Sequence, residues 1–268
     1  MTGPQISLVT PSSNQGTFIS QTIGSVLAQR GVECQYIVVD GGSSDGTSEV
    51  LDSFRGEIDV IISEPDRGQA DALVKGFAYA TAPIVGYLNS DDYLLPGALQ
   101  LVLEHFERQP EVDAWYSHRI FVDEFDHLLR YWYLPPHSNY INLRWDFIPQ
   151  ETCFWRRTAM EAVGGIDRRL DFAMDYDLFV RMMRAGCRFR RLDDFLAVFR
   201  EHDASKTVCH METVGAREVN VVQQANRVSI HWYDRLVAAA FYSWLQLRSA
   251  RLKRRLPLGP DAFIRRKA

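Results

Sequence analysis

The residues that could do chemistry lie in short polar segments, several of which directly follow an apolar run. In the segment Asn89-Ser90-Asp91-Asp92, two carboxylates stand side by side. Such carboxylates could bind a divalent cation together with the oxygens of a diphosphate, because Mg²⁺ and Mn²⁺ prefer oxygen ligands and leave positions open for phosphate. Taken alone, the same residues could have a purely structural role: Asp92 would begin a turn, and Asp91 would be a cap.

A second polar segment begins at Asp40, which ends an apolar run and precedes Gly41 and Gly42. Its carboxylate could accept hydrogen bonds from a nucleobase imide or a ribose hydroxyl, and the glycines would let the backbone approach closely. Alternatively, Asp40 caps its own loop as an Asx turn. The segment has neither the G-x-G-x-x-G spacing of dinucleotide sites nor the Gly-Lys-Ser of a P-loop, so both of these are excluded.

Two more residues, Asp175 and His202, could act in proton transfer or metal binding. Asp175 lies just before a helix that the pattern predicts from about Asp177 to Ala185, where it could be a general base. Acidic residues are also common at helix starts as caps, and this is the simpler interpretation of Asp177. His202 could bind a metal ion, or it could be a surface or packing residue.

In the first ninety residues, continuous apolar runs alternate with segments whose apolar residues recur at helical spacing. This alternation predicts the elements that position these side chains. Continuous apolar runs are typical of buried parallel strands, and helical spacing between them predicts the connecting helices. The predicted elements are strands at 6–10, 36–39, 60–62 and 84–88, and helices at 18–27, after 47 and at 70–77. Ligands bind beyond the carboxyl ends of such strands, so the polar segments 10–14, 40–45 and 89–92 should meet at one edge of the sheet.

The second half of the chain has a looser pattern and is rich in aromatic residues. Its predicted elements are helices at 97–106, 158–163, 177–185 and 208–230, a strand at 114–122, short strands near 189 and 198, and a last helix that ends near 255. In the aromatic stretch 125–155, Trp155 could stack on an acceptor sugar while Gln150 and Glu151 bind its hydroxyls. The alternative is an aromatic core under a long loop.

Charge is distributed unevenly along the 268 residues, whose net charge is −4. Residues 231–268 hold nine Lys or Arg and two Asp, a net +7, and the remaining residues carry −11. A stripe of Leu245, Leu252 and Leu256, flanked by arginines, could place the last helix on an anionic membrane leaflet. A solvated tail or a contact between protomers would explain the leucine stripe and its arginines as well. No aromatic–basic platform accompanies the charge, so nucleic acid is not an expected partner.

Composition narrows the class of protein further. No stretch reaches the about 20 apolar residues of a membrane span, and the first residues do not look like a secretory leader. The four cysteines are far apart and form no CxxC pair, which favours free thiols over a zinc site or a disulfide framework. We therefore expect a cytoplasmic protein that could be peripheral on the inner face of the membrane.

The motifs in this order resemble those of the family 2 glycosyltransferases with the GT-A fold, over about three quarters of the chain, from Ile6 to Thr207. The matching segments are Leu8-Val9-Thr10-Pro11 with Asn14, the stretch 38–47, Glu64-Pro65-Asp66-Arg67-Gly68-Gln69, the segment 88–92, Gly164-Gly165-Ile166-Asp167, and Asp175-Tyr176-Asp177-Leu178. The resemblance implies a fold with a Rossmann-like half and a mainly parallel sheet.

The resemblance also implies roles for individual residues. Nucleotide-sugar contacts would come from Thr10, Pro11, Asp40, Gln69, Asn89, Ser90 and Asp91. Asp91 would be the main metal carboxylate, with His202 beside the metal or the diphosphate, and Asp175 would be the catalytic base. Two departures stand out: Asn89 replaces the first Asp of the family's Asp-x-Asp motif, and Met174 replaces the Glu that precedes the base.

The function expected from this resemblance is transfer of a sugar, with inversion, from a nucleotide-diphosphate sugar to a hydroxyl of a glycan or lipid-linked acceptor. Mg²⁺ or Mn²⁺ would be the cofactor, and a UDP-sugar is favoured as donor, in cell-surface polysaccharide synthesis. The expected domains are 1–207, with a nucleotide half at about 1–95 and an acceptor half at about 96–207, and a helical, basic extension at 208–268. Two alternatives are a nucleotidyltransferase and a non-catalytic nucleotide-sugar binder. A nucleotidyltransferase would need a basic, glycine-rich loop near the N-terminus.

Overall fold

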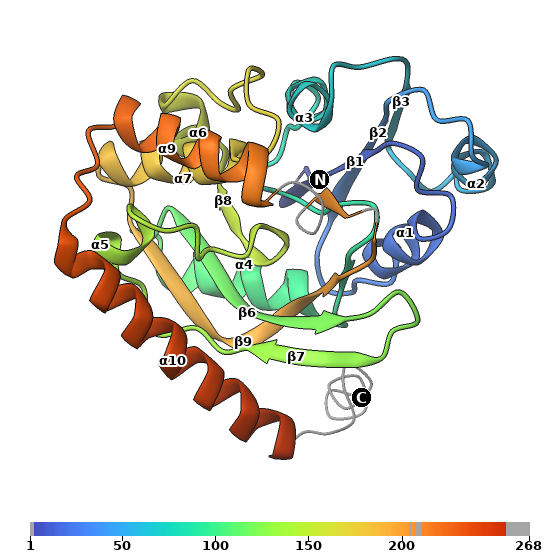
Figure 1. The fold of residues 1–268 in the computed structure, drawn as a ribbon. Coiled ribbons are helices and arrows are strands. Elements are labelled where there is room, and N and C mark those ends of the chain that lie inside the picture. Colours follow the sequence, from blue (N-terminus) through green and yellow to red (C-terminus); the bar gives the residue numbers. More distant parts are fainter. Residues whose placement is uncertain (1–2, 204, 207–210, 256–268) are drawn as a thin grey trace.

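A nine-stranded mixed sheet forms the centre of the structure, a computed structural model that describes residues 3–203, 205–206 and 211–255 (Figure 1). The strand order is β3-β2-β1-β4-β8-β6-β9-β5, and β7 pairs with β6. Strands β1 to β4 pair with one another in parallel, whereas β8 is antiparallel to both β4 and β6. β8 therefore joins the parallel half to the rest of the sheet.

The N-terminal half consists of strands and helices in alternation, as the sequence pattern predicts. The elements are β1 (Ile6–Ser12), α1 (Ile19–Leu27), β2 (Cys34–Asp40), α2 (Thr47–Ser53), β3 (Val60–Ser63), α3 (Gln69–Phe77) and β4 (Ile84–Tyr87). Neighbouring residues of β1 enter opposite cores, because successive side chains of a strand point to opposite faces: Leu8 packs on one side of the sheet and Val9 on the other.

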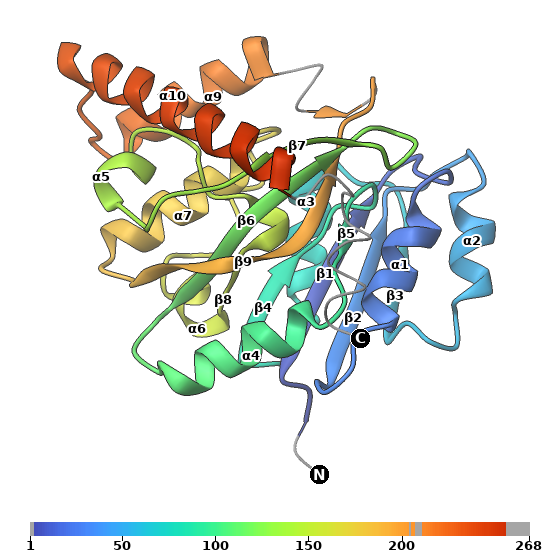
Figure 2. The same ribbon diagram turned by 90° about the horizontal axis from the view of Figure 1, so that it is seen from below.

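The second half completes the sheet and covers it. Its elements are β5 (Tyr93–Leu94), α4 (Ala98–Arg108), β6 (Ala114–Val122), β7 (Leu128–Trp132), α5 (Asn139–Asn142), a 3₁₀ turn (Gln150–Thr152), β8 (Phe154–Arg156), α6 (Arg157–Ala162), α7 (Met174–Arg184), β9 (Phe189–Arg200), a π turn (Met211–Gly215), α9 (Ala216–Ala225) and α10 (Trp232–Arg255). One core lies between the sheet and α1, α2 and α4. A second core lies between the sheet and α3, α6, α7 and α9 (Figure 2).

These layers confirm the predicted α/β fold with a mostly parallel sheet and C-terminal helices. Two local predictions were wrong. The short strands expected near Phe189 and Val198 are one strand, β9, whose pairing with β6 shifts register between Tyr116 and Arg119; the polar residues in its middle mark this irregularity and not a loop. Helix α7 begins at Met174, so Asp175 lies inside its first turn.

The last helix also differs from its prediction. Leu245 is 3% exposed and belongs to the second core, so its predicted place on a membrane-facing stripe is wrong. Leu256 and the side chain of Leu252 fall outside the described residues, as do 208–210 of the helix expected at 208–230. Within the part of the chain that the structure describes, no helix is both long enough and apolar enough to cross a membrane.

Candidate active site

The loop after β4 carries the predicted metal residue Asp91 and is fixed by its neighbours. The backbone N–H of Asp92 donates to the carbonyl of Asn89 at 3.1 Å and closes the turn. Thr22 of α1 donates to the carbonyls of Ser90 and Asp92. The backbone N–H of Arg200 donates to Oδ1 of Asp92 at 3.0 Å, which ties this loop to the end of β9.

The hydrogen bond between Arg200 and Asp92 brings the two predicted metal residues together. His202 follows the last residue of β9 by two positions, and its Nε2 lies 3.0 Å from Oδ2 of Asp91. The His202 ring also packs on Phe18, with ring centroids 4.8 Å apart. The structure thus places an imidazole and a carboxylate, from distant parts of the sequence, in direct contact.

A cavity of about 240 Å³ is lined by Asp91 but not by His202. Five of the residues predicted to contact a nucleotide sugar line it: Pro11, Gln69, Asn89, Ser90 and Asp91. They come from β1, α3 and the loop after β4. Two of the three polar segments expected at this edge, 10–14 and 89–92, thus line the cavity, whereas no residue of 40–45 does.

Thr10 and Asp40 do not line the cavity, although both were predicted to contact the nucleotide. Both residues are fully buried. The hydroxyl of Thr10 is bonded to that of Tyr36 at 3.1 Å. The Asp40 carboxylate accepts from the backbone N–H groups of Gly42 and Ser43 and from the hydroxyls of Ser43 and Ser63. Asp40 is therefore the cap of its own loop, which was the alternative interpretation.

A second cavity, of about 130 Å³, contains the predicted base Asp175. It shares four lining residues with the first cavity, namely Gln69, Asn89, Phe199 and Lys206. At this junction the amide Nε2 of Gln69 donates to Oδ1 of Asn89 at 2.7 Å. Because the two cavities share lining residues, Asp91 and Asp175 line adjoining cavities, which together we call the cleft.

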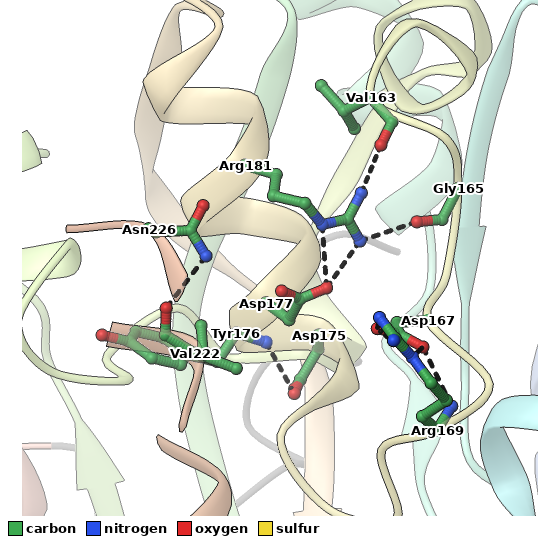
Figure 3. A network of polar contacts seen from close by, with 10 residues as sticks. All are labelled: Val163, Gly165, Asp167, Arg169, Asp175, Tyr176, Asp177, Arg181, Val222 and Asn226. Atoms are coloured by element: carbon green, nitrogen blue, oxygen red, sulfur yellow. Dashed lines mark hydrogen bonds and ion pairs between the residues drawn. The ribbon is translucent and has the colours of Figure 1, made fainter. Parts of the chain in front are cut away.

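Asp175 lies in the first turn of α7, where its Oδ1 accepts the backbone N–H of Tyr176 at 2.8 Å (Figure 3). Burial raises the pKa of Asp175 to about 6, and the hydrogen bond from Tyr176 opposes this rise. A carboxyl group with this pKa is ionised near neutral pH and can accept a proton.

Asp177 has a different role from its neighbour and is not the N-cap of α7. Arg181 donates to Oδ2 of Asp177 through Nε and Nη2, at 2.8 and 2.6 Å, and also to the carbonyls of Val163 and Gly165 (Figure 3). This network fastens α7 to the turn after α6. It holds the helix that presents Asp175, while Asp177 itself does not line the cleft.

Gln150, predicted to bind the acceptor, lines the cavity of Asp175. It is 6% exposed, and neither atom of its amide has a hydrogen-bond partner among the described residues. A buried amide without partners is costly, which makes a polar ligand its natural partner. Glu151 is already paired: Arg119 donates to both of its oxygens at 2.6 Å.

The acceptor role predicted for Trp155 is wrong. The side chain is fully buried and packs against Phe77, Tyr87 and Phe179 in the second core. Its position in β8, between β4 and β6, directs it into the core and away from the cleft. The alternative, an aromatic core, is correct for this residue.

Three cleft residues were missed by sequence reasoning: Arg119, Asp146 and Lys206. Arg119 projects from β6 and lies over the ring of Phe199 at 4.6 Å. Burial raises the pKa of Asp146 well above its ordinary range, and Asp175 adds to the rise. Nζ of Lys206 donates to the carbonyl of Asp171 at 3.0 Å. No motif marks these residues; Arg119 reaches the cleft through the pairing of β6, whereas Asp146 and Lys206 lie outside the strands.

Comparison with known proteins gives an independent line of evidence. A family model described as Glycosyl transferase family 2 matches residues 7–162. The chain is 26% identical over 236 residues to a chondroitin synthase of Pasteurella multocida strain Pm70, in an alignment that covers 86% of this chain and 24% of the synthase. The chain thus spans about a quarter of that relative's length.

Solved structures share the fold. TarS 1–349 of S. aureus, in complex with UDP-GlcNAc, matches with a TM-score of 0.66 at 16% identity, over 84% of this chain and 66% of that one. The mannosyltransferase PcManGT of Pyrobaculum calidifontis, in complex with GDP-Man and Mn²⁺, matches with a TM-score of 0.61 at 15% identity, over 92% of this chain and 84% of that one.

Proposed function

The chain belongs to glycosyl transferase family 2, and from this premise we propose that it transfers a sugar, with inversion, from a nucleotide-diphosphate sugar to a hydroxyl of an acceptor. One observation carries the proposal: Asp91, which contacts His202, lines one cavity, and Asp175 lines a second cavity that shares four lining residues with the first. Donor and acceptor can therefore meet inside one cleft, with an acidic group on each side.

The donor would occupy the larger cavity, which Pro11, Gln69 and Ser90 help to line. Lys206 lies where the two cavities meet and could contribute positive charge toward a diphosphate. We favour a UDP-sugar as donor, in line with the UDP-GlcNAc bound to TarS, a structural relative.

The donor set fits a divalent cation. Asp91 and His202 supply a carboxylate oxygen and an imidazole nitrogen in contact with each other, beside a cavity that can take a diphosphate. Within the described residues no third His, Cys, Asp or Glu joins them, so diphosphate oxygens and water would complete the shell of Mg²⁺ or Mn²⁺. When bound, such a cation offsets the negative charge that develops on the leaving diphosphate.

Asp175 would take the proton from the acceptor hydroxyl as the hydroxyl attacks the anomeric carbon. Its carboxylate is held by Tyr176 at the start of α7, and its raised pKa remains low enough for the ionised form to dominate at neutral pH. Attack from the face opposite the diphosphate is a single displacement, and it inverts the anomeric configuration.

The acceptor would lie in the cavity that contains Gln150, Arg119 and the half-buried ring of Trp132. The unpartnered amide of Gln150 can donate to and accept from sugar hydroxyls, and an aromatic ring suits the apolar face of a sugar. We propose a glycan or a lipid-linked sugar in cell-surface polysaccharide synthesis, the general class of product that the name of the chondroitin synthase indicates.

The test is a panel of nucleotide sugars incubated with the protein and Mn²⁺, with release of nucleoside diphosphate as the readout. We expect slow hydrolysis of at least one donor without acceptor, and its loss in an Asp175→Asn variant. Tight binding of a donor with neither hydrolysis nor transfer to any acceptor would instead support a non-catalytic binder.

A further inference from the structure

The outer face of α10 carries a row of exposed apolar side chains. Trp232 is 77% exposed, and Leu236 and Leu247 are each more than 60% exposed. Residues three, four, seven or eight positions apart share one side of a helix, which places these side chains in one row. The row comprises Trp232, Tyr233, Leu236, Val237, Trp244 and Leu247, and we call it the outer row.

The opposite side of α10 is occupied by the body of the protein. Asp234 is fully buried and pairs with Arg144 at 3.3 Å. The ring of Phe241 packs on Phe147 with centroids 4.3 Å apart, and Leu245 is buried in the second core. Figures 1 and 2 show α10 on the outside of the molecule, along the side where β7 lies. The outer row is therefore additional to the surface that fixes the helix.

Among the side chains of α10 that the structure describes, the exposed charges are all positive. Asp234, its single acidic residue, is buried in the body, whereas Arg248 and Arg251 are exposed where the outer row ends. Arg248 lies over the rings of Trp244 and Tyr133. The sequence continues with Lys253, Arg254 and Arg255. An apolar row that ends in a basic cluster complements a surface with an apolar interior and anionic head groups.

We propose that the outer row and the arginines beside it bind the surface of an anionic lipid membrane, with α10 lying in the plane of the interface. Trp and Tyr side chains favour that depth, and basic residues near an anionic leaflet strengthen binding. The 16 residues from 232 to 247 span about 24 Å. This length is too short to cross the hydrocarbon core, but it suits a helix that lies in the plane of the interface.

This inference goes beyond the proposed function, because lipid binding can be measured without sugar transfer. The experiment is co-sedimentation of the full chain with vesicles of phosphatidylcholine and phosphatidylglycerol, compared with phosphatidylcholine alone. We expect binding to the anionic vesicles that weakens in high salt. Leu236→Gln with Leu247→Gln should lower the partition coefficient at least about tenfold. Arg248→Gln with Arg251→Gln should lower it about thirtyfold at low salt.

Matched controls separate lipid binding from damage to the fold. Arg248→Lys with Arg251→Lys keeps the charge and should bind like the wild type. Tyr79→Gln, at an exposed aromatic residue just after α3, should also bind normally. All variants should keep the wild-type Tm, because the altered side chains lie on the exposed side of their helix or on the surface.

Two results would overturn the proposal. One is equal sedimentation of the wild type and the Leu236/Leu247 variant with anionic vesicles. The other is a wild-type chain that does not bind vesicles but forms dimers in light scattering, together with a Leu236/Leu247 variant that is monomeric. The second result would assign the outer row to a contact between two copies of the chain.

Discussion

His202 Nε2 lies 3.0 Å from Oδ2 of Asp91, so the ends of β4 and β9 meet at one point of the cleft. The contact depends on Asp92, whose carboxylate accepts the backbone N–H of Arg200 two residues before His202. A buried hydrogen bond next to the pair thus sets the distance between two groups that lie far apart in the sequence. The predictions below follow from this arrangement.

Replacing Asp91 by alanine should weaken the metal-dependent part of nucleotide binding. Titration calorimetry with UDP, with and without Mn²⁺, should show that Mn²⁺ raises affinity in the wild type and has much less effect in the variant. The matched control is Asp52→Ala, which removes an exposed carboxylate from α2 that pairs with Arg55. Equal Mn²⁺ dependence in the wild type and Asp91→Ala would show that Asp91 does not hold the metal.

The Asp175→Asn variant should lose at least about a hundredfold in kcat and bind the donor almost normally, as expected when a general base is removed. In the wild type, kcat should rise with pH to about 6 and then level off, because burial raises the pKa of Asp175 to about that value. Initial rates between pH 5 and 8 test both points. A variant with near-normal turnover would move the base to another residue.

The same variant should change how stability depends on pH. Since the pKa of Asp175 is higher in the folded than in the unfolded chain, its contribution to stability is fully present below pH 4 and is lost as the pH rises through about 6. Asparagine stays neutral, so Asp175→Asn should melt above the wild type at pH 7.5 and close to it at pH 4. Scanning calorimetry at both pH values measures this, and a difference of the opposite sign would contradict the buried-carboxylate assignment.

Replacing Gln150 by leucine should raise the KM for the acceptor about tenfold and leave hydrolysis of the donor unchanged. The free protein should be as stable as the wild type or more so, because the change removes a buried amide without partners and keeps the volume. Steady-state kinetics and urea unfolding of one preparation separate these effects. Loss of stability with an unchanged KM would make Gln150 a structural residue.

Glu218 of α9 supports the helix that bears Asp175, since its carboxylate accepts the backbone N–H groups of Asp171, Phe172 and Ala173. Glu218→Ala should lower the free energy of unfolding by about 2 kcal/mol, because a buried N–H loses its partner. Glu218→Gln keeps an acceptor oxygen and should lose less. Urea unfolding of both variants tests the order, and equal losses would show that the single amide oxygen of glutamine cannot replace the two carboxylate oxygens at this position.

The parallel half of the fold was predictable because its strands are buried on both faces and read as continuous apolar runs. Val38 and Val39 show this: each enters a different core, so neither position could be polar. The position of Asp91 follows from the same pattern, because its polar segment comes at the carboxyl end of such a strand, whereas that of Gln69 was implied only by the family resemblance. The domain boundary near residue 207 stays a prediction.

The acceptor side was much harder to predict, because its strands pair out of chain order. β6 lies between β8 and β9, and this arrangement decides that Arg119 faces the cleft while Trp155 enters the core. Nothing in the local sequence distinguishes a core tryptophan from one that stacks on a sugar. Asp40 was misassigned for a related reason, since a carboxylate at a strand end can cap its own loop as easily as bind a ligand.

The most direct test of the central claim is a crystal structure of the Asp175→Asn variant with a UDP-sugar and Mn²⁺. We expect the diphosphate to lie beside Asp91 and His202, with the anomeric carbon facing residue 175 across the junction formed by Gln69 and Asn89. A donor bound elsewhere, or one whose anomeric carbon points away from residue 175, would contradict it.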